Sequence, residues 1–287
     1  MILGADREAV IGNIRYAAEH GDFYAKVELG DPVLTAGEKK AVTDRYLRVR
    51  KTMPYRAKRF LARRIAGAAT RRINRNTEIV GTEMLPDLHG VIVTSNHFGP
   101  LENTVIRHLL ATHGQRRMSV VSQTTNFAMT GPIGFLMNYA DTVPLGEEPR
   151  YLARDLVEVL GEKLRGGEAV LIYPEQEMWF NYRKPRPPKP GAYHFAAKLG
   201  VPVVSCFVEM VDLEVPDTEE FLQVQYRLHV LGTLYPDPAK SLRENTAALA
   251  EADYALKRAA YERIYGKPLT YDFEPSDIAG WRRAHEA

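Results

Sequence analysis

The sequence predicts an α/β fold: a largely parallel or mixed sheet flanked by helices, with an N-terminal helical region and a C-terminal helix. From residue 81 onward, short apolar runs alternate with segments of helical periodicity, as is typical of strands buried on both faces of a sheet. Before residue 81 the patterns are helical and polar. The 287 residues are 45% hydrophobic and 26% charged, which allows a substantial core and excludes a disordered chain.

The chain therefore divides into three regions. Residues 1–80 form an N-terminal helical and basic region, residues 81–235 form the α/β core, and residues 236–287 form a C-terminal helical segment packed on that core. Strands are expected over residues 90–95, 118–122, 142–145, 169–173, 201–208 and 223–230. Helices are expected over residues 101–113, 132–139, 150–164, 191–199 and 240–264, and an acidic loop over residues 212–220.

The composition of the chain bears on the cellular compartment of the protein. Its single cysteine, Cys206, cannot form an internal disulfide bond, so nothing points to an oxidising compartment. No apolar run approaches the roughly 18–20 residues of a membrane span, and the N-terminus lacks the pattern of a signal peptide. We therefore expect a cytoplasmic protein, peripheral on the inner face of the membrane. The net charge of +2 by itself says little about partners.

Positive charge gathers in one segment of the N-terminal region. Residues 45–76 contain twelve Lys or Arg and no Asp or Glu, and Pro54 stands where a helix can begin. Apolar residues follow at helical spacing: Phe60, Leu61, Ile65, Ala68 and Ile73. Such a helix suits an anionic membrane surface, and the alternative is a solvated helix that packs its narrow apolar stripe on the core. Nucleic acid is not an expected partner, because no base-reading or stacking element accompanies the charge.

The first candidate site follows the strand expected over residues 90–95. Asn96 and His97 come directly after it, and Glu102 lies five residues beyond His97, near the start of a helix. Ligands bind at the carboxyl ends of strands in open α/β sheets. Glu102 can turn back to accept a hydrogen bond from one imidazole nitrogen, which leaves the other nitrogen of His97 as a general base. The alternative is an ordinary loop histidine, hydrogen-bonded near a helix start.

A second group of polar residues follows the strand expected over residues 169–173. Pro174 ends this strand and Glu175 comes next, where a buried carboxylate is costly unless it has partners. A proline-rich cationic loop follows, and its basic residues include Arg183, Lys184 and Arg186. This second strand end therefore complements the first with charged groups suited to binding a substrate.

In the order and spacing of these features the chain resembles the glycerolipid acyltransferase superfamily, whose best-known members acylate lysophosphatidic acid. Asn96, His97 and Glu102 are similar to the family's first motif, an Asn-His pair, four residues and an acid. Residues 173–175, Tyr-Pro-Glu, resemble the start of the third motif, Phe-Pro-Glu-Gly-Thr-Arg. Residues 200–204, Gly-Val-Pro-Val-Val, resemble the fourth, Gly-x-Pro and two apolar residues.

Departures from these motifs bear on the substrate. Glu102 stands where the family usually has Asp, and Gln-Glu-Met at residues 176–178 replaces Gly-Thr-Arg. The second motif, whose arginine helps to hold the acceptor phosphate in the family, has no arginine at its expected place near residues 142–146. The substitutes that we consider are Arg150, Arg183, Lys184 and Arg186.

A related branch of the family suggests a different acceptor. Residues 97–102, His-Phe-Gly-Pro-Leu-Glu, look like the first motif of the lipid A late acyltransferases, His-Phe-Gly-Asn-Trp-Glu. Residues 174–177, Pro-Glu-Gln-Glu, resemble a Pro-Asp-Gln-Asp-like element of that branch. A glycolipid acceptor is therefore an alternative to a glycerol phosphate lipid.

The resemblance implies an O-acyltransferase of phospholipid biosynthesis, similar to the 1-acylglycerol-3-phosphate O-acyltransferases. It implies acyl transfer from acyl-CoA or acyl carrier protein to a hydroxyl of a lysophospholipid or glycerol phosphate lipid, with no metal and no cofactor. His97 would be the general base, oriented by Glu102. Substrate binding is assigned to Asn96, Pro174, Glu175, Arg183, Lys184 and Arg186. The alternatives are a non-catalytic lipid-binding protein of the same fold and a thioesterase, in which the same base activates water.

Overall fold

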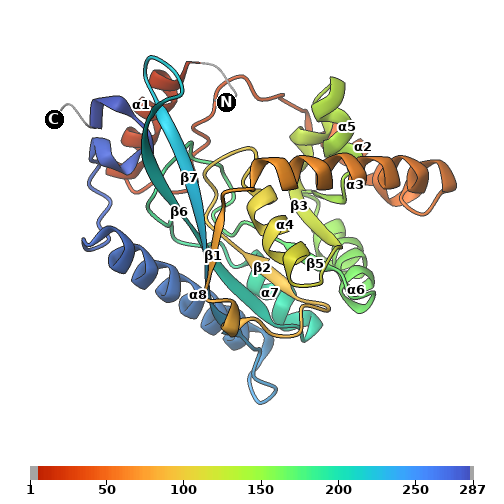
Figure 1. Cartoon of the computed structure of the whole chain (residues 1–287). Helices are drawn as coiled ribbons and strands as arrows, with labels where there is room; N and C mark the ends of the chain where they lie inside the picture. Colours follow the sequence, from red (N-terminus) through yellow and green to blue (C-terminus); the bar gives the residue numbers. More distant parts are fainter. Residues whose placement is uncertain (1–5, 285–287) are drawn as a thin grey trace.

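The computed structural model, which describes residues 6–284, is organised around a seven-stranded sheet in the order β1-β7-β6-β2-β5-β3-β4 (Figure 1). β6 and β7 pair antiparallel, and the other neighbouring pairs are parallel. The strands are β1 (Glu78–Val80), β2 (Ile92–Thr94), β3 (Met118–Gln123), β4 (Thr142–Leu145), β5 (Ala169–Leu171), β6 (Val203–Pro216) and β7 (Leu222–Leu234). The predicted α/β fold with a mixed sheet is confirmed.

Helices flank this sheet on both faces (Figure 1). Within residues 6–284 they are α1 (Arg7–Glu19), α2 (Ala36–Val49), α3 (Met53–Ile73), α4 (Asn103–Thr112), α5 (Gly131–Tyr139), α6 (Leu156–Arg165), α7 (Gly191–Leu199) and α8 (Leu242–Tyr265). A π-helical turn, Tyr151–Asp155, leads into α6. Four short 3₁₀ turns complete the described helical elements: Thr82–Met84, Thr124–Ala128, Pro275–Asp277 and Arg282–Ala284.

Strand residues alternate between two hydrophobic clusters, one on each face of the sheet. Ile92 joins the cluster that contains the buried side chains of α6 and α7, whereas its neighbour Val93 joins the cluster that contains those of α4. Val170 and Leu171 divide between the same two clusters. This alternation is the period of two that a strand imposes on its side chains, and burial on both faces explains why the strands read as continuous apolar runs.

Two strand segments differ from the expected pattern. β1 lies in a segment in which no strand is expected, because its three residues are too few to show alternation, and they pair with the outer edge of β7. β6 continues to Pro216, through part of the segment expected to be an acidic loop. β6 and β7 form a long antiparallel pair, and its hydrogen bonds hold even polar residues in a strand. A register shift between Asp212 and Pro216 marks the irregular end of this pair.

The basic segment of the N-terminal region, residues 45–76, includes the end of α2 and the whole of α3, which contacts α4 and α5. Arg63 donates two hydrogen bonds to the buried carboxylate of Asp141, and Arg59 lies 3.3 Å from the same carboxylate. The outward side of α3 carries exposed Phe60 and Leu61. The cations of this helix are therefore of two kinds, those tied to the core and those exposed to solvent.

Helix α1 packs against residues near the C-terminal end of the chain. Val10 and Ile14 of α1 share a hydrophobic cluster with Trp179 and Ile278, and the Trp179 indole N–H donates to the carbonyl of Ala25 at 3.0 Å. Residues from both ends of the chain therefore pack against the segment that follows β5. In the described part of the chain no helix combines the length and the apolar character needed to cross a bilayer.

Candidate active site

His97 lies in the loop that follows β2, at the carboxyl edge of the sheet. Its Nδ1 forms a short hydrogen bond with Oε1 of Glu102, the residue that precedes α4. The His97 side chain is 20% exposed, whereas Glu102 is 3% exposed. Within residues 6–284 the other ring nitrogen, Nε2, has no hydrogen-bond partner. The structure thus brings together the histidine and the acid that the sequence predicted as a pair, and it leaves one nitrogen free to act as a base.

The turn between the two residues holds the Glu102 carboxylate in place. The backbone N–H groups of Phe98 and Gly99 donate to its Oε2 at 2.5 and 2.7 Å, while Oε1 is left to His97. One carboxylate therefore organises the loop backbone and the imidazole at once. Because both backbone donors are fixed by the fold, the carboxylate can turn little, and the orientation of the imidazole is fixed with it.

The ring of Tyr173 lies flat against the imidazole. The two ring centroids are 4.2 Å apart and the planes differ by 7°. Burial first, and the Glu102 carboxylate second, raise the pKa of the Tyr173 hydroxyl well above its usual value, so the phenol stays neutral at physiological pH. Glu102 holds one nitrogen of the His97 ring, and the stacked ring of Tyr173, at the carboxyl end of the β5 segment, restricts the tilt of the imidazole plane.

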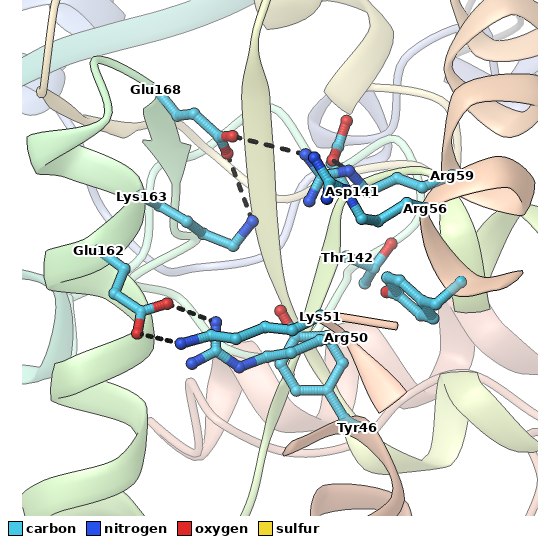
Figure 2. A pocket seen from close by; sticks show the side chains of 11 residues that line it. Tyr46, Arg50, Lys51, Arg56, Arg59, Asp141, Thr142, Glu162, Lys163 and Glu168 are labelled. Atoms are coloured by element: carbon cyan, nitrogen blue, oxygen red, sulfur yellow. Dashed lines mark hydrogen bonds and ion pairs between the residues drawn. The ribbon is translucent and has the colours of Figure 1, made fainter. Parts of the chain in front are cut away.

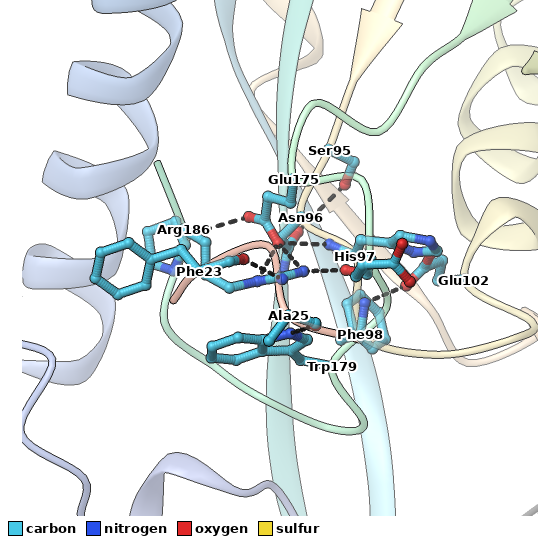
Figure 3. A network of polar contacts seen from close by, with 12 residues as sticks. Phe23, Ala25, Ser95, Asn96, His97, Phe98, Glu102, Glu175, Trp179 and Arg186 are labelled. Atoms are coloured by element: carbon cyan, nitrogen blue, oxygen red, sulfur yellow. Dashed lines mark hydrogen bonds and ion pairs between the residues drawn. The ribbon is translucent and has the colours of Figure 1, made fainter. Parts of the chain in front are cut away.

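A buried ion pair lies behind the histidine (Figure 3). The Arg186 guanidinium, 0% exposed, meets the Glu175 carboxylate at 3.0 Å, and Oε2 of this carboxylate also accepts from the backbone N–H of His97 at 3.2 Å. Arg186 donates further to the carbonyls of Phe23 (2.8 Å) and Glu177, and its guanidinium lies 4.4 Å from the Trp179 ring centroid. These contacts satisfy a buried charge and tie the loop after β5 to the loop after β2.

Backbone hydrogen bonds join the same two loops. The N–H of Trp179 donates to the carbonyl of His97 at 3.0 Å, and the N–H of Asn181 donates to the carbonyl of Phe98 at 2.9 Å. His97 is therefore held on both of its main-chain groups, its N–H by Glu175 and its carbonyl by Trp179.

The remaining predicted site residues lie behind the surface rather than at it. The Asn96 side-chain amide exchanges two hydrogen bonds with the backbone of Val208 in β6, at 3.0 and 2.8 Å. Lys184 is buried and bonds to Asp277, and Arg183 forms an ion pair with Asp212. Pro174 is buried at the end of the β5 segment. These contacts favour positioning roles, and a direct role in substrate binding stays a prediction for all four residues.

One charged residue near the site, Arg107, belongs to none of the motifs found in the sequence. Arg107 lies one turn into α4, is half-buried, and forms no hydrogen bond or ion pair with residues in the range 6–284. Burial lowers the pKa of its guanidinium, although an arginine keeps its charge at neutral pH. Its electrostatic surroundings include Asp141 and Tyr173, the tyrosine stacked on His97. The sequence feature that could have identified Arg107 is its position as an isolated arginine between two apolar residues of this helix, Ile106 and Leu109.

No metal centre accompanies these residues in the part of the chain that the structure describes. No group of three or more His, Cys, Asp or Glu side chains is arranged to hold an ion there. Cys206 is fully buried in β6, where burial raises the pKa of its thiol to about 12. The thiol is therefore protonated at neutral pH and packs as a small apolar side chain.

Part of the chain matches a known protein family. Residues 76–209, which include β2, β5 and both loops, match the model of the family described as Acyltransferase. The match agrees with the acyltransferase motifs found in the sequence, and it confirms the recognition made from them.

The fold comparison extends beyond that segment. The crystal structure of the 1-acyl-sn-glycerophosphate (LPA) acyltransferase PlsC from Thermotoga maritima aligns over 82% of this chain and 96% of that chain, with a TM-score of 0.52 and 17% sequence identity. At this identity the likeness concerns the fold. No curated protein sequence matches the chain.

The Glu175–Arg186 pair yields a prediction about stability. Glu175→Gln leaves the buried guanidinium uncompensated, so we expect a loss of about 3–5 kcal/mol in the free energy of unfolding, measured by urea denaturation. The double variant Glu175→Gln/Arg186→Met should recover part of this loss, because an apolar side chain then replaces the unpaired charge. A loss near that of an exposed ion pair, about 0–1 kcal/mol, would show that this pair does not hold the two loops.

Proposed function

We propose that the protein transfers a fatty acyl group from acyl-CoA or acyl carrier protein to a hydroxyl of a lysophospholipid or glycerol phosphate lipid. The observation that carries the proposal is the His97–Glu102 pair, with Nε2 of His97 unpartnered within residues 6–284, at the carboxyl edge of the sheet in a chain with an acyltransferase domain. The likeness to an LPA acyltransferase structure supports the fold on which this chemistry would take place.

In the proposed reaction His97 carries the proton. Nε2 removes the proton of the acceptor hydroxyl while the oxygen attacks the thioester carbonyl, and a tetrahedral oxyanion forms. The oxyanion collapses, the carbon–sulfur bond breaks, and the proton passes from His97 to the departing thiolate. Glu102 stabilises the imidazolium between these two transfers and is a positioning residue, and Tyr173 holds the plane of the ring.

Arg107 is the cation that we propose for the acceptor phosphate. It carries a positive charge with no ion pair to another residue of the described range, and its surroundings include Tyr173, which touches His97. Phosphate accepts hydrogen bonds only, and the fork of N–H donors on a guanidinium matches it well. By contrast, Arg183, Lys184 and Arg186 already form ion pairs with carboxylates of the protein.

Loss of the base tests the mechanism. His97→Ala should lower kcat for acyl transfer from acyl-CoA to lysophosphatidate by roughly 10²- to 10⁴-fold, because a positioned general base is removed. Glu102→Gln should also slow turnover, and Glu102→Asp should keep part of the activity. The assay follows products by mass, with lysophospholipids, glycolipids and water as competing acceptors.

Several outcomes of this assay would contradict the proposal. Normal turnover by a folded His97→Ala variant rules out the mechanism. An acylated glycolipid as the product would show that the acceptor is a glycolipid and not a lysophospholipid. Free fatty acid as the sole product would indicate a thioesterase. No product with any acceptor would favour lipid binding without catalysis. His108→Ala, a histidine of α4 without a carboxylate partner in the described residues, is the matched control and should retain activity.

The acceptor phosphate is tested separately. Arg107→Ala should raise KM for lysophosphatidate by about tenfold or more with a smaller effect on kcat, since it removes a charged hydrogen-bond partner of the bound substrate. KM for an uncharged monoacylglycerol should change little. Arg116→Ala, which removes an exposed arginine just after α4, is the control. An equal loss with both acceptors would show that Arg107 supports the fold instead.

We further propose that the outward face of α3 binds an anionic membrane. Met53, Phe60 and Leu61 are 72%, 65% and 53% exposed, so their apolar surface is available to a bilayer. Three exposed arginines accompany them on the same helix: Arg64, Arg71 and Arg72. Apolar insertion and attraction to anionic lipids add, and each cation close to such a surface contributes roughly 1 kcal/mol.

Vesicle co-sedimentation tests this surface. Reversing Arg64, Arg71 and Arg72 to Glu should release the protein from anionic vesicles, and salt should weaken binding of the unmodified protein. Arg63 is left unchanged, because its ion pair with Asp141 belongs to the fold. The control reverses three exposed arginines elsewhere, Arg116, Arg154 and Arg243. Equal release by both triple variants, or equal binding to neutral vesicles, would contradict a specific role for α3.

A further inference from the structure

A cavity of about 410 Å³ lies between the N-terminal helices and the sheet (Figure 2). Side chains of α3 and of the turn before it face side chains of α6 across this space. Its floor is formed at the amino ends of two strands, by Asp141 and Thr142 at β4 and by Glu168 just before β5. The volume falls in the range of small-molecule sites.

This cavity is distinct from the His97 site. β2, β5, β3 and β4 are parallel neighbours, so their amino ends share one edge of the sheet and their carboxyl ends share the other. The cavity lies at the amino edge, whereas His97 and Glu175 follow the carboxyl ends of β2 and β5. A ligand bound in the cavity therefore does not occupy the proposed catalytic position.

The acidic side chains of the cavity are all engaged. Glu162 accepts from Arg50 at 2.6 Å and from Lys51 at 2.7 Å. Glu168 accepts from Ser119 at 2.9 Å and from Lys163 at 3.3 Å, and Asp141 is paired with two arginines of α3. Against these three acids the lining holds five cations: Arg50, Lys51, Arg56, Arg59 and Lys163.

Several hydrogen-bond donors of the lining remain without a partner. Within residues 6–284, no hydrogen bond or ion pair occupies the Arg56 guanidinium, the Tyr46 hydroxyl or the Thr142 hydroxyl. An excess of positive charge, with spare donors and occupied acceptors, fits a ligand that is anionic and accepts hydrogen bonds. Phosphate has both properties, and the volume leaves room for an organic substituent beside the rings of Tyr46 and Tyr55.

We propose that this cavity binds the phosphate of a small organic phosphate ester, with Arg56 and Tyr46 as ligand-binding residues. The same chemistry is offered by a free nucleotide and by a phospholipid headgroup presented at a membrane surface. Such a ligand touches α2, α3 and α6 at once. Its binding energy therefore adds to the attachment of the N-terminal helices to the core.

Titration calorimetry on the full chain tests the proposal with two kinds of probe. One arm uses adenosine 3′,5′-bisphosphate in solution, and the other uses vesicles of phosphatidylcholine with and without phosphatidic acid. Saturable binding in the first arm identifies a soluble ester. Phosphate-dependent binding in the second arm alone identifies a lipid headgroup in the cavity if it persists when Arg64, Arg71 and Arg72 are reversed to Glu. In whichever arm binds, Arg56→Ala should weaken the affinity by about tenfold or more and Tyr46→Phe by a few-fold.

Matched variants separate this cavity from other anion sites. Arg64→Ala removes an exposed arginine from the outward side of the same helix and should leave binding of the soluble ester unchanged. His97→Ala and Arg107→Ala should also leave it unchanged, because both residues lie outside the cavity lining. The proposal is overturned if neither probe binds, if folded Arg56→Ala binds like the unmodified protein, or if His97→Ala or Arg107→Ala abolishes binding. Far-ultraviolet circular dichroism confirms that each variant is folded.

Discussion

The structure around the proposed active site depends on one constraint, the neutralisation of the buried guanidinium of Arg186. A fully buried cation is tolerated only with a carboxylate and further acceptors, and Glu175 with the carbonyls of Phe23 and Glu177 supplies them. To meet Arg186, Glu175 must lie beside the N–H of His97. The contacts that neutralise Arg186 thus bring together the N-terminal segment, the loop after β5 and the loop after β2.

The sequence could predict those parts of the site that depend on the order of strands, turns and helices along the chain. The sequence predicted polar residues directly after two apolar strands. Parallel strands end at a common edge of the sheet, and the loops of His97 and Glu175 are hydrogen-bonded there. The return of Glu102 to His97 follows from a short turn into a helix. These relations need only secondary structure, and they agree with the geometry of the structure.

Other relations depend on tertiary packing, which the sequence pattern does not show. In the sequence, Arg183, Lys184 and Arg186 look like one cationic loop. In the structure Arg183 pairs with Asp212 and Lys184 pairs with Asp277, both far away in sequence. Arg186 pairs with Glu175, at the start of the same loop. In α3 the adjacent Arg63 and Arg64 are indistinguishable in sequence. The helix directs one to the buried Asp141 and leaves the other exposed, because neighbouring residues on a helix differ by about 100° in direction.

α3 connects the surfaces that the proposals assign to ligands. Near its N-terminal end Arg56 lines the cavity at the amino edge, and just beyond its other end the Asn74 amide donates to the Thr104 hydroxyl of α4 at 2.9 Å. Thr104 follows Glu102 by two residues, so the helix that contacts the membrane in our proposal is hydrogen-bonded to the segment that orients His97. Its inward arginines are fixed by Asp141, and its outward ones remain for lipid. A single helix with two kinds of arginine can therefore place the proposed catalytic edge of the sheet at a fixed position relative to the bilayer.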